Sequence, residues 1–217
     1  MLVNPTYGAG GAQSSGYVEE ELLCLYDGDT QTVVPTPTAT ESSGTYDWGR
    51  CNSSQGATIE GYITMTGASV GAYSRGFNAG VGGTEFCLGF GNGGGGSNSD
   101  YFFNPMIFWG GSVDYNIYPN DLKYGDKHTF AIVSTPDPEE VEQNVLSFYV
   151  DGVQVGDTKQ QNRNAIHNTF YGIVVEGGTS RPMNGTLLSG RFYTRALTVA
   201  ELAANHANDI AKYGGNT

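Results

Sequence analysis

The last third of the chain carries the clearest alternation of apolar and polar residues. Leu146, Phe148 and Val150 alternate with polar or aromatic neighbours, which is the period of a half-buried strand. Asp151-Gly152 follows at once and predicts a hairpin, because a type I′ turn needs positive φ and glycine adopts it freely. Val153 and Val155 are then expected on the return strand, and residues 186–195 on a further strand.

A helix is predicted over residues 198–213. Thr198 and Glu201 have the spacing of a capping box, in which each side chain accepts a hydrogen bond from the other residue's backbone N–H. Gly214-Gly215 ends the helix. Its expected apolar stripe is the set that recurs at helical spacing, Val199, Leu202, Ala203, His206 and Ile210.

Short strands are also predicted upstream, at 22–26, 58–66, 85–90, 101–109, 114–118 and 128–134. Within 58–66, Ile59, Ile63 and Met65 share one face, and Glu60, Tyr62 and Thr64 share the other. Pro105 lacks the N–H that a central strand needs, so 101–109 is predicted as an edge strand, a bulge or two short strands.

These elements predict an all-β fold, a two-sheet antiparallel β-sandwich of jelly-roll type with a short C-terminal helix. Residues 1–18 are rich in Gly, Ser, Ala and Tyr, and are predicted to form an N-terminal arm. Residues 19–217 contain no linker composition, so they are predicted to be a single domain. The arm is expected to be tied down on its own domain or on a neighbour.

Charge excludes two classes of partner. The formal net charge is −12 and the sequence pI is about 4.4, so nucleic acid and anionic membrane surfaces are not expected to bind. No stretch is long and apolar enough to span a bilayer, and the N-terminus lacks the pattern of a signal peptide. Cys24, Cys51 and Cys87 have no metal-site spacing. They are either three free thiols or one disulfide with a spare cysteine.

The residues around the C-terminal strand also resemble a known family. The runs FYVDGVQVG (residues 148–156) and GRFYTRALTVAEL (residues 190–202) are similar to the end of laminin G-like (LamG or pentraxin-like) domains, in the concanavalin A-like lectin/glucanase superfamily. Residues 22–31 are similar to the opening strand of that family. The resemblance implies that the first and last strands pair in one sheet, and that the domain serves adhesion or glycan binding.

The same superfamily includes β-glucanases, so paired carboxylates are the catalytic pattern to test. A glucanase motif similar to E-x-D-x-x-E is absent, and no G-x-S-x-G elbow occurs. The three histidines are scattered. His206 is expected to be packed or partly buried on the helix stripe, and His128 and His167 to be solvated. An enzyme, a glycoside hydrolase in particular, is therefore disfavoured.

Calcium is the cofactor that the resemblance brings into question, since LamG-like domains often bind it through loop oxygens. Asp27, Asp29 and Asp114 are the candidate ligands, with Asn116 and Asp151 as further loop oxygens. No EF-hand spacing appears, and Asp27-Gly28-Asp29 has an equally good explanation as a turn former. No other cofactor is indicated.

Aromatic residues provide the remaining indication of function. Sugar rings stack their C–H faces on aromatic planes, and the aromatics that lie near Asn-, Ser- and Asp-rich loops are Trp48, Tyr73, Tyr101, Trp109, Tyr115 and Tyr118. Packing in a core or an interface explains any one of them as well. The resulting hypothesis is a non-catalytic glycan-binding or adhesion module on a phage virion or a bacterial surface assembly, as part of an oligomer. The alternative is a purely structural virion or decoration protein that binds no glycan.

Overall fold

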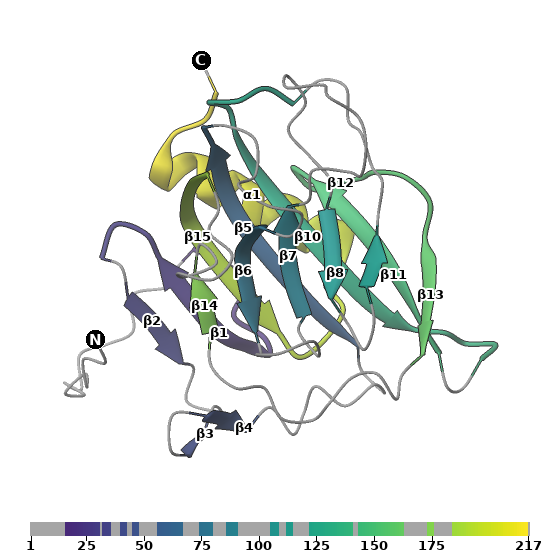
Figure 1. Ribbon diagram of the computed structural model, residues 1–217. Helices are drawn as coiled ribbons and strands as arrows, with labels where there is room; N and C mark the ends of the chain where they lie inside the picture. Colours follow the sequence, from purple (N-terminus) through teal and green to yellow (C-terminus); the bar gives the residue numbers. More distant parts are fainter. Residues whose placement is uncertain are drawn as a thin grey trace.

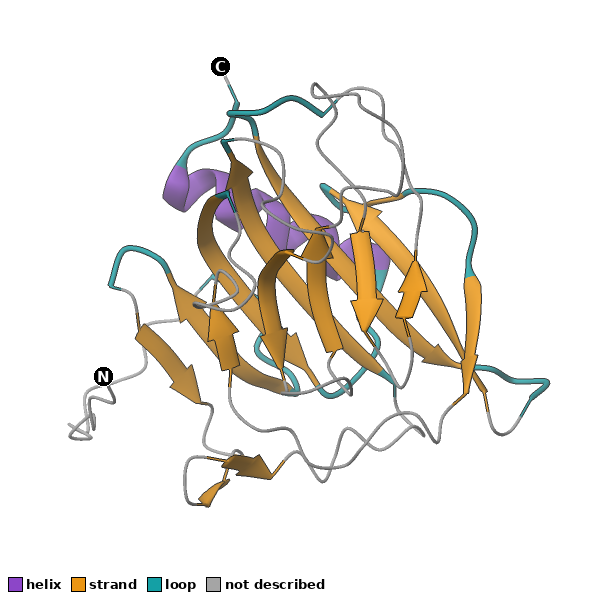
Figure 2. Ribbon diagram, in the orientation of Figure 1, coloured by secondary structure: helices purple, strands orange, loops and turns teal. Residues whose placement is uncertain are grey.

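The computed structural model describes thirteen stretches of the chain, which are residues 16–30, 32–35, 40–42, 45–47, 56–66, 74–79, 86–90, 105–108, 112–114, 122–140, 143–162, 173–175 and 184–216. Two antiparallel sheets face each other, and a single helix in the described part lies on the outer face of the larger sheet (Figure 1). The predicted all-β sandwich with a C-terminal helix is therefore confirmed. Figure 2 shows how strands make up most of the described chain.

The larger sheet has eight strands in the order β12-β11-β10-β5-β15-β1-β2, with β13 also paired to β11. Their bounds are Leu22–Asp27 (β1), Thr32–Pro35 (β2), Ala57–Met65 (β5), Lys127–Pro136 (β10), Gln143–Val150 (β11), Val153–Gln154 (β12), Lys159–Asn162 (β13) and Gly185–Tyr193 (β15). The first and last strands pair as the resemblance implied, from Leu22 opposite Tyr193 to Asp27 opposite Ser189.

The smaller sheet has five strands in the order β14-β6-β7-β8-β9, and a separate pair is formed by β3 and β4. The bounds are Thr40–Ser42 (β3), Thr45–Asp47 (β4), Ser74–Ala79 (β6), Phe86–Phe90 (β7), Pro105–Phe108 (β8), Ser112–Asp114 (β9) and Ile173–Val175 (β14). Of the three alternatives for residues 101–109, the edge strand is wrong, because β8 pairs on both sides. The bulge and the two short strands stay predictions, since residues 101–104 and 109 lie outside the described residues. Pro105 is the first residue of β8, where proline is tolerated in a sheet.

The predicted hairpin is confirmed at its turn. Asp151 and Gly152 have φ values of 53° and 78°, the positive pair that a type I′ turn requires. The return strand β12 is shorter than expected, because it ends at Gln154 and leaves Val155 outside.

The core between the sheets is built by residues that face one another across four strands. Phe192, Ile59, Ile132 and Phe148 form one row across β15, β5, β10 and β11, and each is at most 1% exposed. Gly61 lies on the same face, where an added Cβ would come within 3.0 Å of Leu88 Cδ1 on β7. This apolar face therefore packs against the smaller sheet.

The helix α1 spans Val199–Tyr213, and the predicted capping box between Thr198 and Glu201 is present. Of its predicted apolar stripe, Leu202 is buried as expected, but the rest of the buried side is wrong. The buried residues are Leu202, Asn205 and Asp209, whereas Val199 and Ile210 are exposed. The reason is that the sheet face beneath the second half of α1 is polar, so the helix turns its polar side inward. In the described part of the chain no helix is long and apolar enough to cross a membrane.

Candidate functional site

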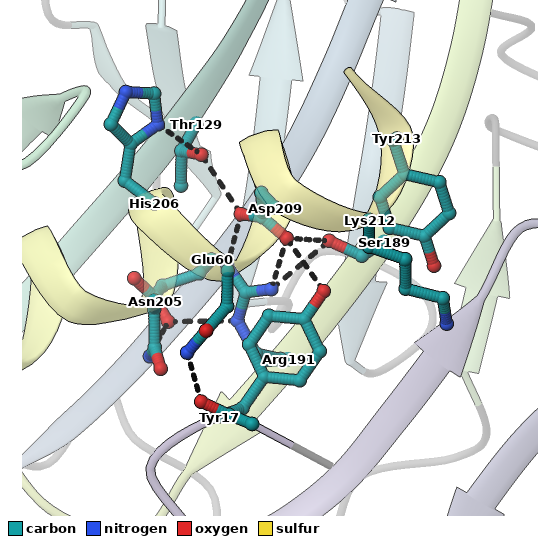
Figure 3. Close-up of polar contacts among 12 residues, drawn as sticks. Tyr17, Glu60, Thr129, Ser189, Arg191, Asn205, His206, Asp209, Lys212 and Tyr213 are labelled. Atoms are coloured by element: carbon teal, nitrogen blue, oxygen red, sulfur yellow. Dashed lines mark hydrogen bonds and ion pairs between the residues drawn. The ribbon is translucent and has the colours of Figure 1, made fainter. Parts of the chain in front are cut away.

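A cluster of three charged side chains is buried between α1 and the larger sheet. Arg191 Nη1 and Nη2 donate to the two carboxylate oxygens of Asp209 at 2.7 and 2.8 Å, and Arg191 Nε donates to Glu60 Oε2 at 3.0 Å (Figure 3). None of the three residues has any exposed surface. One guanidinium therefore holds two carboxylates in the interior of the protein.

The alternation of the strands brings these groups together. Arg191 on β15 lies directly opposite Glu60 on β5, so their side chains leave the sheet on the same face. Asn205 and Asp209 are four residues apart on α1, and both point at that face. Asn205 Nδ2 donates to Glu60 Oε2 at 2.6 Å, which adds a second contact between helix and sheet.

Asp209 accepts three further hydrogen bonds besides those from Arg191. Ser189 Oγ donates at 2.6 Å, Thr129 Oγ1 at 2.9 Å and the Tyr17 hydroxyl at 3.0 Å. Its partners thus come from β15, β10 and the segment before β1. This saturation lets an ionised carboxylate exist without contact with water.

The two carboxylates differ in their electrostatics. Burial alone would raise the pKa of Asp209, but the charge of Arg191 and the hydrogen bonds outweigh it, and the net pKa is lowered. Burial raises the pKa of Glu60, and the attraction of Arg191 does not fully offset it. Glu60 Oε1 is buried and has no hydrogen-bond partner among the described residues. Glu60 is therefore the carboxylate of the pair that takes up a proton first.

Residues 16–18, the described end of the predicted N-terminal arm, close the cluster. The Tyr17 ring lies over the Arg191 guanidinium with Cζ 4.4 Å from the ring centroid. Val18 N donates to Asn205 Oδ1 at 2.9 Å, and the Tyr193 hydroxyl donates to Val18 O at 3.1 Å. The segment is attached to the domain by side chains of α1 and β15.

Two histidines meet at one end of the cluster. His128 Nδ1 lies 2.7 Å from Asp151 Oδ2, and His206 Nδ1 lies 3.4 Å from Asp151 Oδ1 and 2.9 Å from Thr129 Oγ1. The Thr129 hydroxyl proton goes to Asp209, so His206 Nδ1 must donate to Thr129. His206 is partly buried, as predicted. The expectation that His128 is solvated is wrong, since His128 is buried and both rings lie close to Asp151. His167 lies outside the described residues.

This arrangement fixes the position of α1 and offers no access to a substrate. Its central groups have no exposed surface, so in this conformation they cannot exchange protons with a bound molecule. The hydrogen bonds link the helix to β5, β10, β15 and the segment before β1. The cluster is the best-formed polar site in the described part of the chain, and its chemistry is structural.

None of the residues that the sequence singled out for binding belongs to the buried cluster as the structure describes it. All six aromatic candidates, Trp48, Tyr73, Tyr101, Trp109, Tyr115 and Tyr118, fall outside the described residues. Of the calcium candidates, Asp27 Oδ2 accepts from Lys212 Nζ at 2.8 Å, and Asp27 Oδ1 accepts from the Tyr213 hydroxyl and from Asp29 N, each at 3.0 Å. Asp27 therefore forms the turn that the sequence also allowed.

Asp29 is exposed in that turn, and Asp114 is the last residue of β9. No group of three or more potential metal-binding side chains occurs within the described stretches. Calcium binding by Asp27, Asp29 and Asp114 thus stays a prediction.

Sequence reasoning missed the cluster for a physical reason. Glu60, Arg191 and Asp209 are far apart in the chain, and each is unremarkable among its neighbours. One available indication was the polar alternation of residues 189–193, where Ser189 and Arg191 share a face with Tyr193. The three polar residues of α1 at positions 205, 206 and 209 were a second indication. The apolar residues at helical spacing predicted a different buried side.

Comparison with known proteins identifies the fold and does not identify a family or a function. No family model and no curated protein sequence matches the chain. Among solved structures, a sialidase from Trypanosoma rangeli is similar at 12% identity with a TM-score of 0.51, over 91% of this chain and 34% of that one.

Two structures of toxin binding domains are similar as well. The binding domain of botulinum neurotoxin serotype D/C VPI 5993 has 11% identity and a TM-score of 0.55, over 87% of this chain and 52% of that one. The binding domain of botulinum neurotoxin DC in complex with SialylT has 10% identity and a TM-score of 0.57, over 90% and 52%. The chain thus spans between a third and about half of these proteins. At such low identities the likeness shows an antiparallel β-sandwich fold alone.

Proposed function

We propose that this chain is a non-catalytic, LamG-like module that binds glycans and serves adhesion at a virion or bacterial surface. One observation carries the proposal. On the face of the larger sheet that α1 covers, the polar side chains of the cluster bind the helix and are buried. A glycan would therefore bind another part of the lectin-like sandwich. The loops that contain the six predicted aromatics are the parts of the sequence whose chemistry suits a sugar.

The carboxylates of the buried cluster support a non-catalytic role. A glycosidase needs two carboxyl groups on either side of a bound sugar, one of them free to give up a proton. Glu60 and Asp209 instead flank Arg191, and neither has exposed surface. A hydrolase would have to use a different pair.

The structural neighbours add support by analogy of fold. One of them is named as a binding domain in complex with SialylT, and others as sialidases. Fold does not fix function, so this analogy raises the expectation of a glycan ligand without naming a sugar.

A glycan array tests the proposal directly. The purified chain is expected to bind a defined subset of glycans, and repeating the screen with calcium and with a chelator assigns any role to Asp27, Asp29 and Asp114. Single substitutions of Trp48 and Trp109 by Ala should weaken binding by about tenfold or more, since stacking of an aromatic ring contributes about 1–3 kcal/mol. Tyr124→Ala, in the turn before β10, is the matched control and should bind like the wild type. The absence of binding to any glycan in both buffers would contradict the proposal.

A purely structural role in a surface assembly is the second candidate. It is favoured by the exposed apolar residues Val153, Val199 and Ile210 on and beside α1. A chain that binds no glycan but associates through this region would fit that role.

A further inference from the structure

Residues 16–18, just before β1, pass over the buried cluster, and we call them the N-terminal strap. The strap is not part of a strand, and Tyr17 in it is buried against the Arg191 guanidinium (Figure 3). It is bound to the domain through side chains of α1 and β15. A few side-chain hydrogen bonds hold a segment less firmly than a strand ladder does. We therefore expect the strap to open at a lower free energy than the sheets.

The strap and the sheet bind the same two side chains of the helix. Asp209 Oδ1 accepts from the Tyr17 hydroxyl and from Arg191 Nη1. Asn205 Oδ1 accepts from Val18 N, while its Nδ2 donates to the sheet. Each of these side chains therefore holds the helix to the sheet and the strap to the helix. Two contacts that share their groups in this way stabilise each other.

We propose that the N-terminal strap is a releasable latch, which tightens the attachment of α1 when bound and loosens the middle of the helix when released, while the β-sandwich stays folded. With the strap bound, Arg191, Glu60 and Asp209 have no exposed surface, so any displacement of the helix leaves a buried charge unpaired. With the strap released, the ring of Tyr17 no longer covers the guanidinium. Water can then solvate a displaced charge, and the displacement costs less.

The two ends of α1 have anchors of their own, which confines the effect to the middle of the helix. The capping box of Thr198 holds the first turn. At the other end, Lys127 Nζ donates to Tyr213 O at 2.6 Å, and the Tyr62 hydroxyl donates to Gly214 O at 2.7 Å. These anchors come from β5 and β10. We therefore expect release of the strap to loosen the helix and not to detach it.

The position of the strap in the chain indicates what would release it. The ladder of β1 with β15 begins at Leu22, after the strap. A pull on the chain from the side of residue 16 therefore meets the contacts of Tyr17 and Val18 before it reaches the ladder. Gly16 has a φ of 78°, a conformation that favours glycine. Its carbonyl accepts from Asn208 Nδ2 of the helix, so this strained residue is itself part of the latch.

Hydrogen exchange of the full chain under native conditions, resolved by residue with ¹H–¹⁵N NMR, tests the proposal. The amide of Val18 reports on the strap because it donates to Asn205 Oδ1, and the amides of residues 205–209 report on the helix. In the wild type, both sets should exchange at least about 100-fold faster than the amide of Ile132 in the central strand β10. Such a difference requires the latch to open while the sandwich is folded.

Tyr17→Phe removes only the hydroxyl that donates to Asp209. It should speed the exchange of Val18 and of residues 205–209 by the same factor, about tenfold or more, because hydrogen bonds to charged groups are the strong ones. Gly16→Ala strains the strap without changing a side chain of the cluster, and should also speed both.

Tyr149→Phe is the matched control. Tyr149 is buried in the apolar half of the same interface, with Leu202, so the same chemical change is made outside the cluster. It should leave the exchange of Val18 unchanged. Two results would overturn the inference. One is a Val18 amide that exchanges as slowly as that of Ile132, and the other is a Tyr17→Phe variant in which Val18 exchanges faster but residues 205–209 do not. Neither result depends on whether the chain binds glycans.

Discussion

The two faces of the eight-stranded sheet are both buried, yet they are held in opposite ways. The face toward the smaller sheet is a row of close-packed apolar residues, of which Ile59 and Phe148 are typical. The face toward α1 is also apolar under Leu202, where Ala131 and Val133 lie, but it becomes ionic under Asp209. Tyr149 and Tyr193 complete the apolar half.

This difference separates two means of fixing an element. Apolar packing is strong, non-directional and tolerant of small shifts. A buried ion cluster adds little net stability, but it demands one geometry, since any displacement leaves charges unpaired. The helix α1 is therefore anchored by packing at Leu202 and set in register by the contacts of Asn205 and Asp209. We expect the two faces to respond differently to substitution.

The largest effect is expected from Arg191→Met. It removes the only cation that Glu60 and Asp209 contact in the cluster and leaves two buried carboxylates without it, so the free energy of unfolding should fall by about 3–5 kcal/mol. Urea denaturation measures the loss. The control is Arg195→Met, which removes a partly exposed partner of Glu201 and should cost about 1 kcal/mol or less.

A triple variant sharpens this prediction. Glu60→Leu and Asp209→Leu added to Arg191→Met should recover part of the loss, because apolar residues replace the whole set of charges. A triple variant that is less stable than Arg191→Met by the sum of two further losses would contradict the view that unpaired charge is the main cost.

On the apolar face, Ile59→Ala is expected to cost about 2–5 kcal/mol through lost burial and a cavity. On this face, a second substitution that removes a neighbouring side chain should not restore the lost stability. Combining Ile59→Ala with Phe148→Ala should lower the free energy of unfolding further in urea melts, because each substitution removes apolar contacts and neither removes an unpaired charge. Recovery in the double variant would mean that the two faces do not differ as described.

The cap of α1 should matter less than either face. Thr198→Ala removes the side chain that accepts from Glu201 N, and a lost N-cap costs about 1 kcal/mol. Thermal melts are sensitive enough to measure this loss, with Ala200→Gly as a comparison for helix propensity alone. If Thr198→Ala lowered the free energy of unfolding as much as Arg191→Met, the local stability of the helix, and not its packing on the sheet, would determine the stability of the protein.

The smallest expected effect is a change in how the free energy of unfolding depends on pH. The pKa of Glu60 is raised, so its contribution to stability is complete below the ordinary glutamate pKa and is lost as pH rises through the native value. Glu60→Gln has no such loss. The free energy of unfolding of this variant relative to wild type should therefore rise as pH increases from the ordinary glutamate pKa through the native value. A difference that is constant with pH would mean that Glu60 stays ionised throughout.

Glu201 should act in the reverse direction at lower pH. Its hydrogen bonds with Arg195 lower its pKa to about 2, so its contribution is present above the ordinary glutamate pKa and is lost as pH falls toward 2.

Local patterns predicted much of the fold. The alternation around Phe148, the positive-φ turn at Asp151-Gly152 and the capping box at Thr198 each depend on neighbours in sequence, and all three are present. The stripe of α1 was predicted wrongly because helical spacing cannot tell which side is covered. Val199 and Ile210 fit an apolar stripe in sequence, and only the sheet beneath decides that Asn205 and Asp209 face inward.

The polar cluster could not be predicted because its geometry depends on long-range pairing. Nothing within the neighbours of Glu60 indicates that Arg191 lies opposite it across β5 and β15. The same holds for His128 and His206, which come together only because the hairpin turn brings Asp151 between β10 and α1. The aromatic glycan candidates stay a prediction from composition and position in the sequence.

We propose that the helix side of the domain is structural and that glycans bind to another part of it. A glycan titration followed by two-dimensional ¹H–¹⁵N NMR tests it most directly, because the chain has only two tryptophans and therefore two indole signals, from Trp48 and Trp109. We expect a binding glycan to shift one or both indole signals and to leave the signals of His206 and Asn205 in place. A glycan that shifts His206 and Asn205, with both indoles unchanged, would contradict it.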